Sequence, residues 1–391
     1  MVLALLSKYD INFTMNELQI ELQNTIEKFR LAKIEPHMEH DDANEHFRMD
    51  IFQEMGALGL TGVTTDEKYG GMSLGYQDFC VVLEEIAKSS VSYSVTVSVS
   101  SMVQSILQKF GTEKQKQDYL PALASGEEIG SFCLSESHSG SDAAALKTTA
   151  KKVKGGYNLN GSKMWITSAG YAKTYIVMAR TGGAGAKGVS SFIVRDGMKG
   201  FSYGKQEQKM GWRASHTREV VFDNCFVPEE NLLASEGEGF KIAMSALDRG
   251  RITIGAIAVG LSQRALDEAV KYSLERQQFN QPIFDFQGLQ WMMADMSCEI
   301  VASRLLVERA AENFDNDKID TKLSSMAKMK ATDTAMKVTT DAVQIHGGVG
   351  YTKEYPVERY MRDAKVLQIV EGTNQVQKVV IARELKKEYT R

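Results

Sequence analysis

Residues 368–377 read QIVEGTNQVQ, and this segment separates two stretches that have the apolar spacing of helices. Residues 356–369 precede it and residues 374–387 follow it. Between them, Glu371 stands after an apolar pair and before a Gly-Thr turn. A helix, a tight turn with one acid and a second helix indicate the closing part of a helical bundle. They also raise the question of why a carboxylate lies at that turn.

The segments upstream supply further helices for such a bundle. Residues 239–279 contain no proline and repeat apolar residues at helical spacing. Residues 283–314 and 320–345 follow the same pattern. Because short joints between long helices favour antiparallel neighbours, we expect a four-helix bundle at the C-terminal end of the chain.

The rest of the chain divides into a helical part and a strand-rich part. Helical spacing continues to about Gly126, and Thr112 with Gln115 three residues later fits a capping box. Residues 129–233 are rich in β-branched and aromatic residues bounded by glycines, which predicts hairpins and meanders. The expected fold is therefore multidomain α and β. Its predicted domains are an N-terminal all-α domain (1–127), a middle β-domain (128–237) and a C-terminal four-helix bundle (238–391).

One glycine-rich motif has the spacing of a dinucleotide fingerprint but the wrong context. GAGAKG, residues 183–188, fits GxGxxG and follows a strand-like run. Such a fingerprint must open a helix, whereas VSSFIVRD, residues 189–196, is strand-like. We predict a hairpin loop at this position.

The composition is that of an ordinary globular protein and weighs against several partners. Hydrophobic residues make up 43% and charged residues 25% of the chain, the net charge is −4, and no long basic run occurs. We therefore expect neither nucleic acid nor membrane insertion. The apolar run within residues 1–14 lacks a basic leader and a cleavage site, so we expect an extension or a start-site artefact rather than a signal peptide.

Cysteine and histidine spacing predicts no metal site. The four cysteines are far apart, which favours buried free thiols in a reducing cytosol. Three neighbouring histidines alternate with acids, as on a solvated face. The cysteines are Cys80, Cys133, Cys225 and Cys298, and the histidines are His37, His40 and His46.

Six segments, in this order on the α-β-α layout, together resemble the acyl-CoA dehydrogenase family. They are FCLSESHSGSDAAALKT (132–148), GSKMWITSAG (161–170), KMGWRASHTREVVFDNCFVPEENLL (209–233), DRGRI (248–252), ERQQF (275–279) and QIHGGVGYTKEYPVERYMRDAKVLQIVEGTNQ (344–375). The resemblance implies a flavoenzyme of fatty-acid or branched-chain oxidation. It also implies bound FAD, a homotetramer and electron transfer to an electron-transfer flavoprotein. The expected location is the bacterial cytoplasm, with a mitochondrial matrix as the alternative.

The implied reaction is α,β-dehydrogenation of an acyl-CoA thioester to the trans-2-enoyl-CoA. A base must stand within hydrogen-bond reach of the α-proton, and a dry setting raises the pKa of a carboxyl toward neutrality. Glu371 matches the catalytic glutamate of the family. Some members carry the base on the first bundle helix, just before an arginine. Here Gly250 fills that position before Arg251, so Glu371 has no rival.

The resemblance also assigns binding residues. The expected FAD contacts are Cys133, Leu134, Ser135, Ser141, Trp165, Ile166, Thr167, Arg276, Phe279, Gln287, Gln344, Gly347, Gly348, Thr373 and Gln375. Gln344, Gly347 and Gly348 match a backbone site for the FAD of a neighbouring subunit. Thr373 would also cap the last helix. The expected acyl-CoA contacts are Ser141, Asp248, Arg251 and Gly372.

The chain departs from the family pattern at two places that bear on the site. Ser135-Glu136-Ser137 replaces the common Thr-Glu-Pro, which predicts a looser loop with flavin bonding retained. Val370 replaces a frequent tyrosine before the base, which changes the pocket wall. The GR pair favours short-chain or short branched-chain members. Four alternatives remain open: an enoyl-CoA reductase, an oxidase passing electrons to O₂, a non-catalytic acyl-CoA binder and a nucleic-acid-associated relative.

Overall fold

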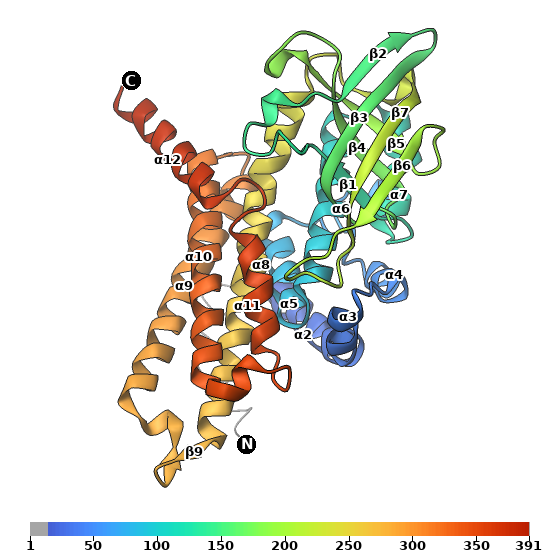
Figure 1. The fold of residues 1–391 in the computed structure, drawn as a ribbon. Coiled ribbons are helices and arrows are strands. Elements are labelled where there is room, and N and C mark those ends of the chain that lie inside the picture. The colour runs from blue at the N-terminus through green and yellow to red at the C-terminus, as the bar shows by residue number, and fades with distance from the viewer. Residues whose placement is uncertain (1–14, 391) are drawn as a thin grey trace.

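The computed structural model describes residues 15–390, so the expected extension at residues 1–14 lies outside the described residues. The chain begins with a helical part and continues into a β-sheet and a long helical bundle (Figure 1). This order confirms the expected fold class. The helices of the first part are α2 (Glu17–Phe29), α3 (Met38–Asn44), α4 (Met49–Ala57), α5 (Tyr76–Ser89), α6 (Val91–Phe110) and α7 (Glu113–Ala124).

The expected capping box at α7 is present. Thr112 Oγ1 accepts from the Gln115 amide at 3.2 Å, and Gln115 Oε1 accepts from the Thr112 amide at 2.8 Å. These bonds satisfy two amides that a helix start otherwise leaves free. Gly126 follows the helix at φ +73°, a conformation that glycine adopts without strain.

A single sheet carries most of the middle part. Its strands run in the order β6-β7-β3-β2-β4-β5-β8, with β1 also paired to β4. They are β1 (Gly130–Cys133), β2 (Thr149–Val153), β3 (Gly156–Thr167), β4 (Thr174–Arg180), β5 (Val189–Arg195), β6 (Phe201–Gln206), β7 (Thr217–Pro228) and β8 (Leu232–Leu233).

The sheet corrects the expectation of hairpins and meanders alone. β1 and β2 each pair with β4 in parallel. A long loop joins β1 to β2, so these two strands do not form a hairpin with each other. The hairpin expected at GAGAKG is confirmed. β4 and β5 pair antiparallel around it, and only a 3-10 turn, Ala186–Gly188, forms there.

Long helices make up the last part. They are α8 (Gly239–Glu275), α9 (Gln287–Asp315), α10 (Thr321–His346), α11 (Val357–Leu367) and α12 (Asn374–Tyr389). The first of these is shorter than expected, because Arg276 is extended and residues 277–282 form the hairpin β9 (Gln277–Gln278) and β10 (Gln281–Pro282). Figure 1 shows α8 to α11 side by side and the end of α12 projecting away from them.

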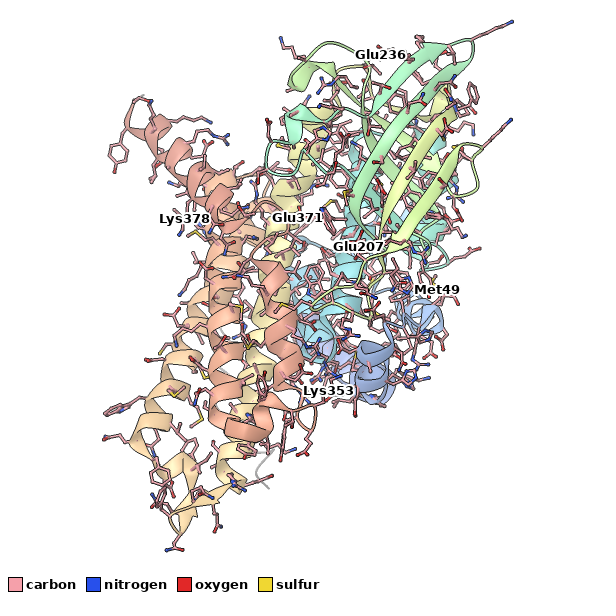
Figure 2. All side chains as sticks on the ribbon, viewed as in Figure 1. Met49, Glu207, Glu236, Lys353, Glu371 and Lys378 are labelled. Atoms are coloured by element: carbon pink, nitrogen blue, oxygen red, sulfur yellow. The ribbon has the colours of Figure 1, made fainter. Side chains whose placement is uncertain are left out.

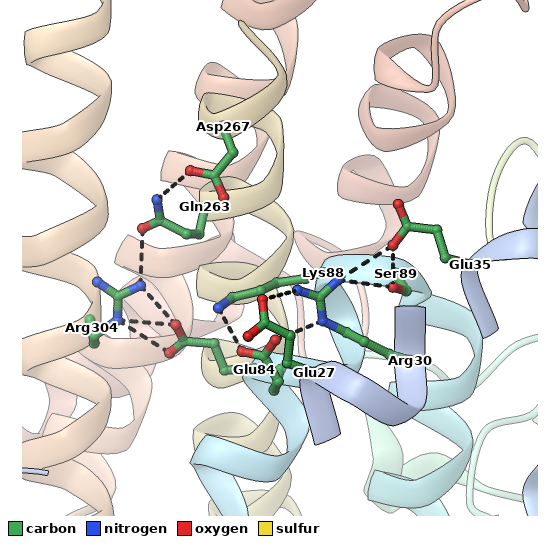
Figure 3. Close-up of polar contacts among 10 residues, drawn as sticks. Glu27, Arg30, Glu35, Glu84, Lys88, Ser89, Gln263, Asp267 and Arg304 are labelled. Atoms are coloured by element: carbon green, nitrogen blue, oxygen red, sulfur yellow. Dashed lines mark hydrogen bonds and ion pairs between the residues drawn. The ribbon is translucent and has the colours of Figure 1, made fainter. Parts of the chain in front are cut away.

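Charged side chains join the N-terminal helices to the bundle (Figure 3). Arg304 on α9 bonds to Glu84 on α5, and its Nη2 donates to Gln263 on α8 at 3.2 Å. At the next residue of α5, the buried Glu85 accepts from Arg30 Nε at 2.6 Å. An apolar core runs through the helices and the sheet beside this network, so α5 and α8 are held in a fixed relation.

Three of the four cysteines are buried, as expected, but Cys298 is exposed because it lies on the outer face of α9. All four are free thiols. Within residues 15–390, no group of three potential metal ligands comes together, and no helix is long and apolar enough to cross a membrane.

Candidate active site

The turn between α11 and α12 holds Glu371 in an unusual backbone conformation. Glu371 has φ +54° and Gly372 has φ +87°. The left-handed region costs little for glycine but is strained for most other residues. Thr373 Oγ1 then accepts from the Val376 amide at 3.2 Å and caps α12, as expected. The sequence VEGTN therefore makes a sharp reversal that presents one carboxylate.

Two buried side chains from other positions hold this turn in place. Gln377 Nε2 donates to the carbonyls of Glu371 at 3.0 Å and Gly372 at 2.7 Å. Lys328 Nζ on α10 donates to the same Gly372 carbonyl at 3.0 Å. Neither residue was singled out from the sequence. The only available signal was the pair Lys328 and Lys330 within a stretch of apolar and small residues, SSMAKMKA (324–331).

The Glu371 side chain points toward α8 and lies against Gly250. A Cβ atom at Gly250 would stand 2.6 Å from both Cδ and Oε2 of Glu371, and 2.8 Å from Cε of Met102. The absence of a side chain at residue 250 therefore makes the room that the carboxyl occupies. Figure 2 shows Glu371 at the level where the bundle faces the sheet. Gly250 is thus packed closely against the candidate base.

Part of the Glu371 carboxyl is dry. The residue as a whole is partly exposed, but its Oε2 atom is buried and has no hydrogen-bond partner in the part of the chain that the structure describes. Burial raises the pKa of Glu371 to about 7, and the nearby charges of Arg251 and Lys328 oppose that rise. A carboxylate with such a pKa can accept a proton near neutral pH.

Arg251 and Asp248 form a pair on α8 close to this carboxyl. Arg251 Nη1 donates to Asp248 Oδ1 at 2.8 Å, and Thr321 Oγ1 donates to Asp248 Oδ2 at 3.2 Å. Arg251 is buried and its Nε has no partner among residues 15–390. This pair is therefore part of the interior of the site and differs from an ordinary solvated pair on a helix.

A small cavity lies on the other side of Gly250. It is lined by Tyr76, Phe79, Ser98, Ser101, Met102, Arg249, Gly250 and Thr253. Gly250 and Met102 border both this cavity and the Glu371 carboxyl. The cavity lies between α5, α6 and α8 and measures about 10 Å³, which is room for about one water molecule. No local pattern in the sequence indicates which residues line it.

On the sheet side, β1 and β3 bring together the residues expected along a flavin. The Met164 amide donates to the Ser135 carbonyl at 2.9 Å, and Ser131 Oγ donates to the Thr167 carbonyl at 2.7 Å. The pairing of β3 with β7 shifts register between Lys163 and Ile166. Such a bulge re-aims a side chain.

The side chain at this bulge is Trp165, which has φ +63° and is 59% exposed. An exposed indole beside buried Cys133, Leu134 and Ile166 offers a flat apolar surface for a planar ring. The structure therefore fits a flavin at this place.

The loop after Ser135 is held without its usual proline. Glu136 is buried and accepts from the amides of Lys147 at 2.6 Å and Thr148 at 2.9 Å, and from Lys163 Nζ at 2.7 Å. These bonds tie Glu136 to the segment that leads into β2 and to β3, and the looser loop expected at Ser137 stays a prediction. Ser141, at the far end of this loop, is exposed.

The remaining expected FAD contacts form a second group at the opposite end of the bundle. They are exposed and lie at the β9–β10 hairpin, the start of α9 and the end of α10 (Figure 1). Gln344 follows Lys328 by 16 residues on α10, which separates it from the Glu371 turn by about 24 Å along the helix. One chain therefore does not bring the two groups together. The second group consists of Arg276, Phe279, Gln287, Gln344, Gly347 and Gly348.

Comparison with known families accounts for nearly the whole chain. Three family models match it in order: acyl-CoA dehydrogenase, N-terminal domain, over residues 16–127; middle domain, over residues 131–225; and C-terminal domain, over residues 237–386. An acyl-CoA dehydrogenase of Bacillus subtilis (strain 168) is 44% identical over 94% of this chain and 97% of that protein.

Solved structures agree with this match. Butyryl-CoA dehydrogenase from Megasphaera elsdenii superposes with a TM-score of 0.94 at 42% identity, covering 96% of this chain and 100% of that one. A chain in a structure described as the electron transferring flavoprotein of Acidaminococcus fermentans also superposes with a TM-score of 0.94. It is 45% identical, over 96% of this chain and 99% of that chain.

Proposed function

Because the chain belongs to the acyl-CoA dehydrogenase family, we propose that it oxidises a short acyl-CoA to the trans-2-enoyl-CoA, with Glu371 as the base. The chain is an FAD-dependent oxidoreductase, as the family is. The observation that carries the role of Glu371 is its buried, unpartnered Oε2 atom against Gly250.

The geometry of the turn suits removal of an α-proton. Gln377 holds the Glu371 carbonyl and Lys328 holds the Gly372 carbonyl, so the turn that carries the carboxyl is already in place before the reaction. A substrate bound beside Gly250 would bring its α-carbon near Oε2 of Glu371. Entry of the substrate would exclude water and favour the neutral carboxylic acid that forms as the proton moves.

FAD supplies the acceptor for the hydride that leaves the β-carbon. Ser135 and the segment Trp165, Ile166 and Thr167 would hold and cover the flavin ring on the sheet side. Asp248, Arg251, Ser141 and Gly372 would contact the CoA part of the substrate. Arg251 is suited to a polar or anionic ligand because its Nε remains free.

We propose that the complete FAD site needs a second copy of the chain, in a homotetramer. The support is the distance of about 24 Å along α10 between the Glu371 turn and Gln344. Exposed apolar side chains near the second group, including Phe279 at 87% and Tyr351 at 88%, would be covered by such an assembly. Light scattering on the FAD-loaded protein that shows a monomer would contradict this proposal.

A short acyl chain and an electron-transfer flavoprotein are the proposed substrate and electron acceptor. The likeness to butyryl-CoA dehydrogenase favours a short chain. The likeness to the Acidaminococcus fermentans chain supports the acceptor. We place the reaction in fatty-acid breakdown in a bacterial cytoplasm, since the relatives include bacterial enzymes.

Anaerobic titration with a series of acyl-CoAs tests the proposal. The purified protein should be yellow, with about one FAD for each chain, and should bleach most completely with short acyl-CoAs. A colourless protein that takes up no FAD, or a yellow one that no acyl-CoA bleaches, would contradict it. Admitting O₂ afterwards distinguishes the oxidase alternative, because an oxidase regains its colour rapidly.

A further inference from the structure

Lys328 is a fully buried lysine that lies directly behind the Glu371 turn. It belongs to α10, and its side chain is 0% exposed. Its Nζ donates to the Gly372 carbonyl at 3.0 Å and to Asn374 Oδ1 at 2.8 Å. These two acceptors flank Thr373, so one ammonium group joins the residue after the candidate base to the first residue of α12.

A second set of bonds extends this anchor. Asn374 Nδ2 donates to Thr332 Oγ1 at 3.0 Å and to Asp333 Oδ1 at 2.7 Å, both on α10. Lys328 and Asn374 thus tie the turn to α10 at several points within two helical turns. Gln377 contacts the same Gly372 carbonyl from α12. The position of Glu371 is therefore set from α10 as well as from its own segment.

Burying the charged form of Lys328 costs free energy, because the ammonium group loses its hydration. Among the described residues no carboxylate lies within ion-pair distance of Lys328, and its partners are neutral oxygens. An apolar residue of similar size would fill the space without the desolvation of an ammonium. A buried cation close to a buried carboxyl changes the proton affinity of that carboxyl.

We propose that Lys328 is a positioning residue for the reaction: it anchors the Glu371 turn and places a positive charge behind the base. This inference rests on the proposed function, since it deepens the role given to Glu371. The charged groups that face the pair are Arg251 with Asp248 on α8 and Asp333 on α10. The other contacts come from the neutral side chains Asn374 and Gln377.

The electrostatics agree with the geometry. Burial lowers the pKa of Lys328 to about 7, and the negative charges of Glu371 and Asp333 oppose that fall. The Lys328 charge in turn opposes the rise in the pKa of Glu371. Removing the charge should therefore raise the pKa of Glu371 further and leave less carboxylate at neutral pH.

Three variants separate anchoring from charge. Lys328→Met removes both the charge and the donors, and it keeps the length. Lys328→Gln removes the charge but keeps an NH₂ donor for the Gly372 carbonyl. Lys337→Met, on the exposed face of the same helix, is the matched control, because its pair with Asp341 is remote from the turn. Each FAD-loaded tetramer is mixed anaerobically with butyryl-CoA, and flavin bleaching is followed across the neutral pH range.

We expect Lys328→Met to bleach roughly fivefold more slowly at neutral pH, which corresponds to a rise of about one unit from the Glu371 pKa of about 7. Its acid limb should move to higher pH, while FAD content and butyryl-CoA affinity stay near the parental values. Lys328→Gln should show the same pH shift with a smaller loss at alkaline pH. Lys337→Met should match the parent.

The inference is overturned if the pH profiles of both Lys328 variants coincide with that of the parent. If Lys328→Met loses its FAD, the pH profile of Lys328→Gln decides whether the inference holds, because glutamine keeps a donor to the turn. A rate loss of the same size at every pH would mean that Lys328 only anchors the turn. It would also overturn the proposed effect of the Lys328 charge on the pKa of Glu371. Failure of the parent itself to bleach is a different outcome, since it refutes the proposed function.

Discussion

The catalytic carboxylate should be able to move from residue 371 to residue 250 with part of the activity kept. The Glu371 carboxyl occupies the space beside Gly250, since a Cβ at residue 250 would stand only 2.6 Å from it. A carboxylate carried by residue 250 would therefore enter the same space that the Glu371 carboxyl occupies. The double variant Glu371→Gly with Gly250→Glu should place a base near the same α-carbon.

The structure sets the expected size of each effect. Glu371→Gly removes the base, which is typically worth roughly 10²–10⁴ in rate. Gly250→Glu alone forces two carboxyls into one space and should also be slow. The double variant should exceed Glu371→Gly, yet remain about a hundredfold below the parent, since a misplaced catalytic group costs about that much. Its preference for acyl chain length should change, because a side chain enters one wall and leaves another.

Anaerobic stopped-flow bleaching of the flavin with a series of acyl-CoAs measures all four proteins. The four rates form a double-mutant cycle, in which the coupling between residues 250 and 371 should be large and favourable. Equal FAD content in the four proteins is the control for folding. A double variant that is no faster than Glu371→Gly, at every chain length, would refute the idea that the two positions reach the same atom.

Three further outcomes follow from the same site. Gly250→Ala should leave the melting temperature unchanged or higher, since alanine favours a helix by about 1 kcal/mol relative to glycine. The same variant should slow bleaching at least about tenfold, because the new Cβ displaces the Glu371 carboxyl. Bleaching at the parental rate would contradict this. Bleaching by the parent should rise with pH through the neutral range, because the carboxylate form of Glu371 increases above its pKa of about 7; a flat profile would count against that residue. Arg251→Met should move this rise to higher pH, because the Arg251 charge opposes the raised pKa; an unmoved profile would show that Arg251 does not act on the base.

Much of the fold follows from local patterns in the sequence. Helical spacing, the Thr112 cap and the Thr373 cap depend on neighbouring residues, and the structure has them where expected. The end of α8 and the parallel pairing of β1 with β4 depend on contacts between distant segments. Local patterns do not contain that information, so both were predicted incorrectly.

The candidate site shows the same division. Glu371 and Gly250 were found through the family resemblance, and the structure adds that they touch. Lys328 and Gln377 escaped notice because a buried lysine and a buried glutamine look like surface residues in a sequence. Their importance depends on the Gly372 carbonyl, a backbone group that carries no sequence signal.

The most direct test of the account is the rate of flavin bleaching by butyryl-CoA in Glu371→Gln. The amide keeps the shape of the side chain and removes only the basic group. The account predicts a yellow protein that still binds FAD and acyl-CoA, with bleaching slowed by roughly 10²–10⁴. Bleaching as fast as in the parent would contradict the central claim, because Glu371 would then not be the base.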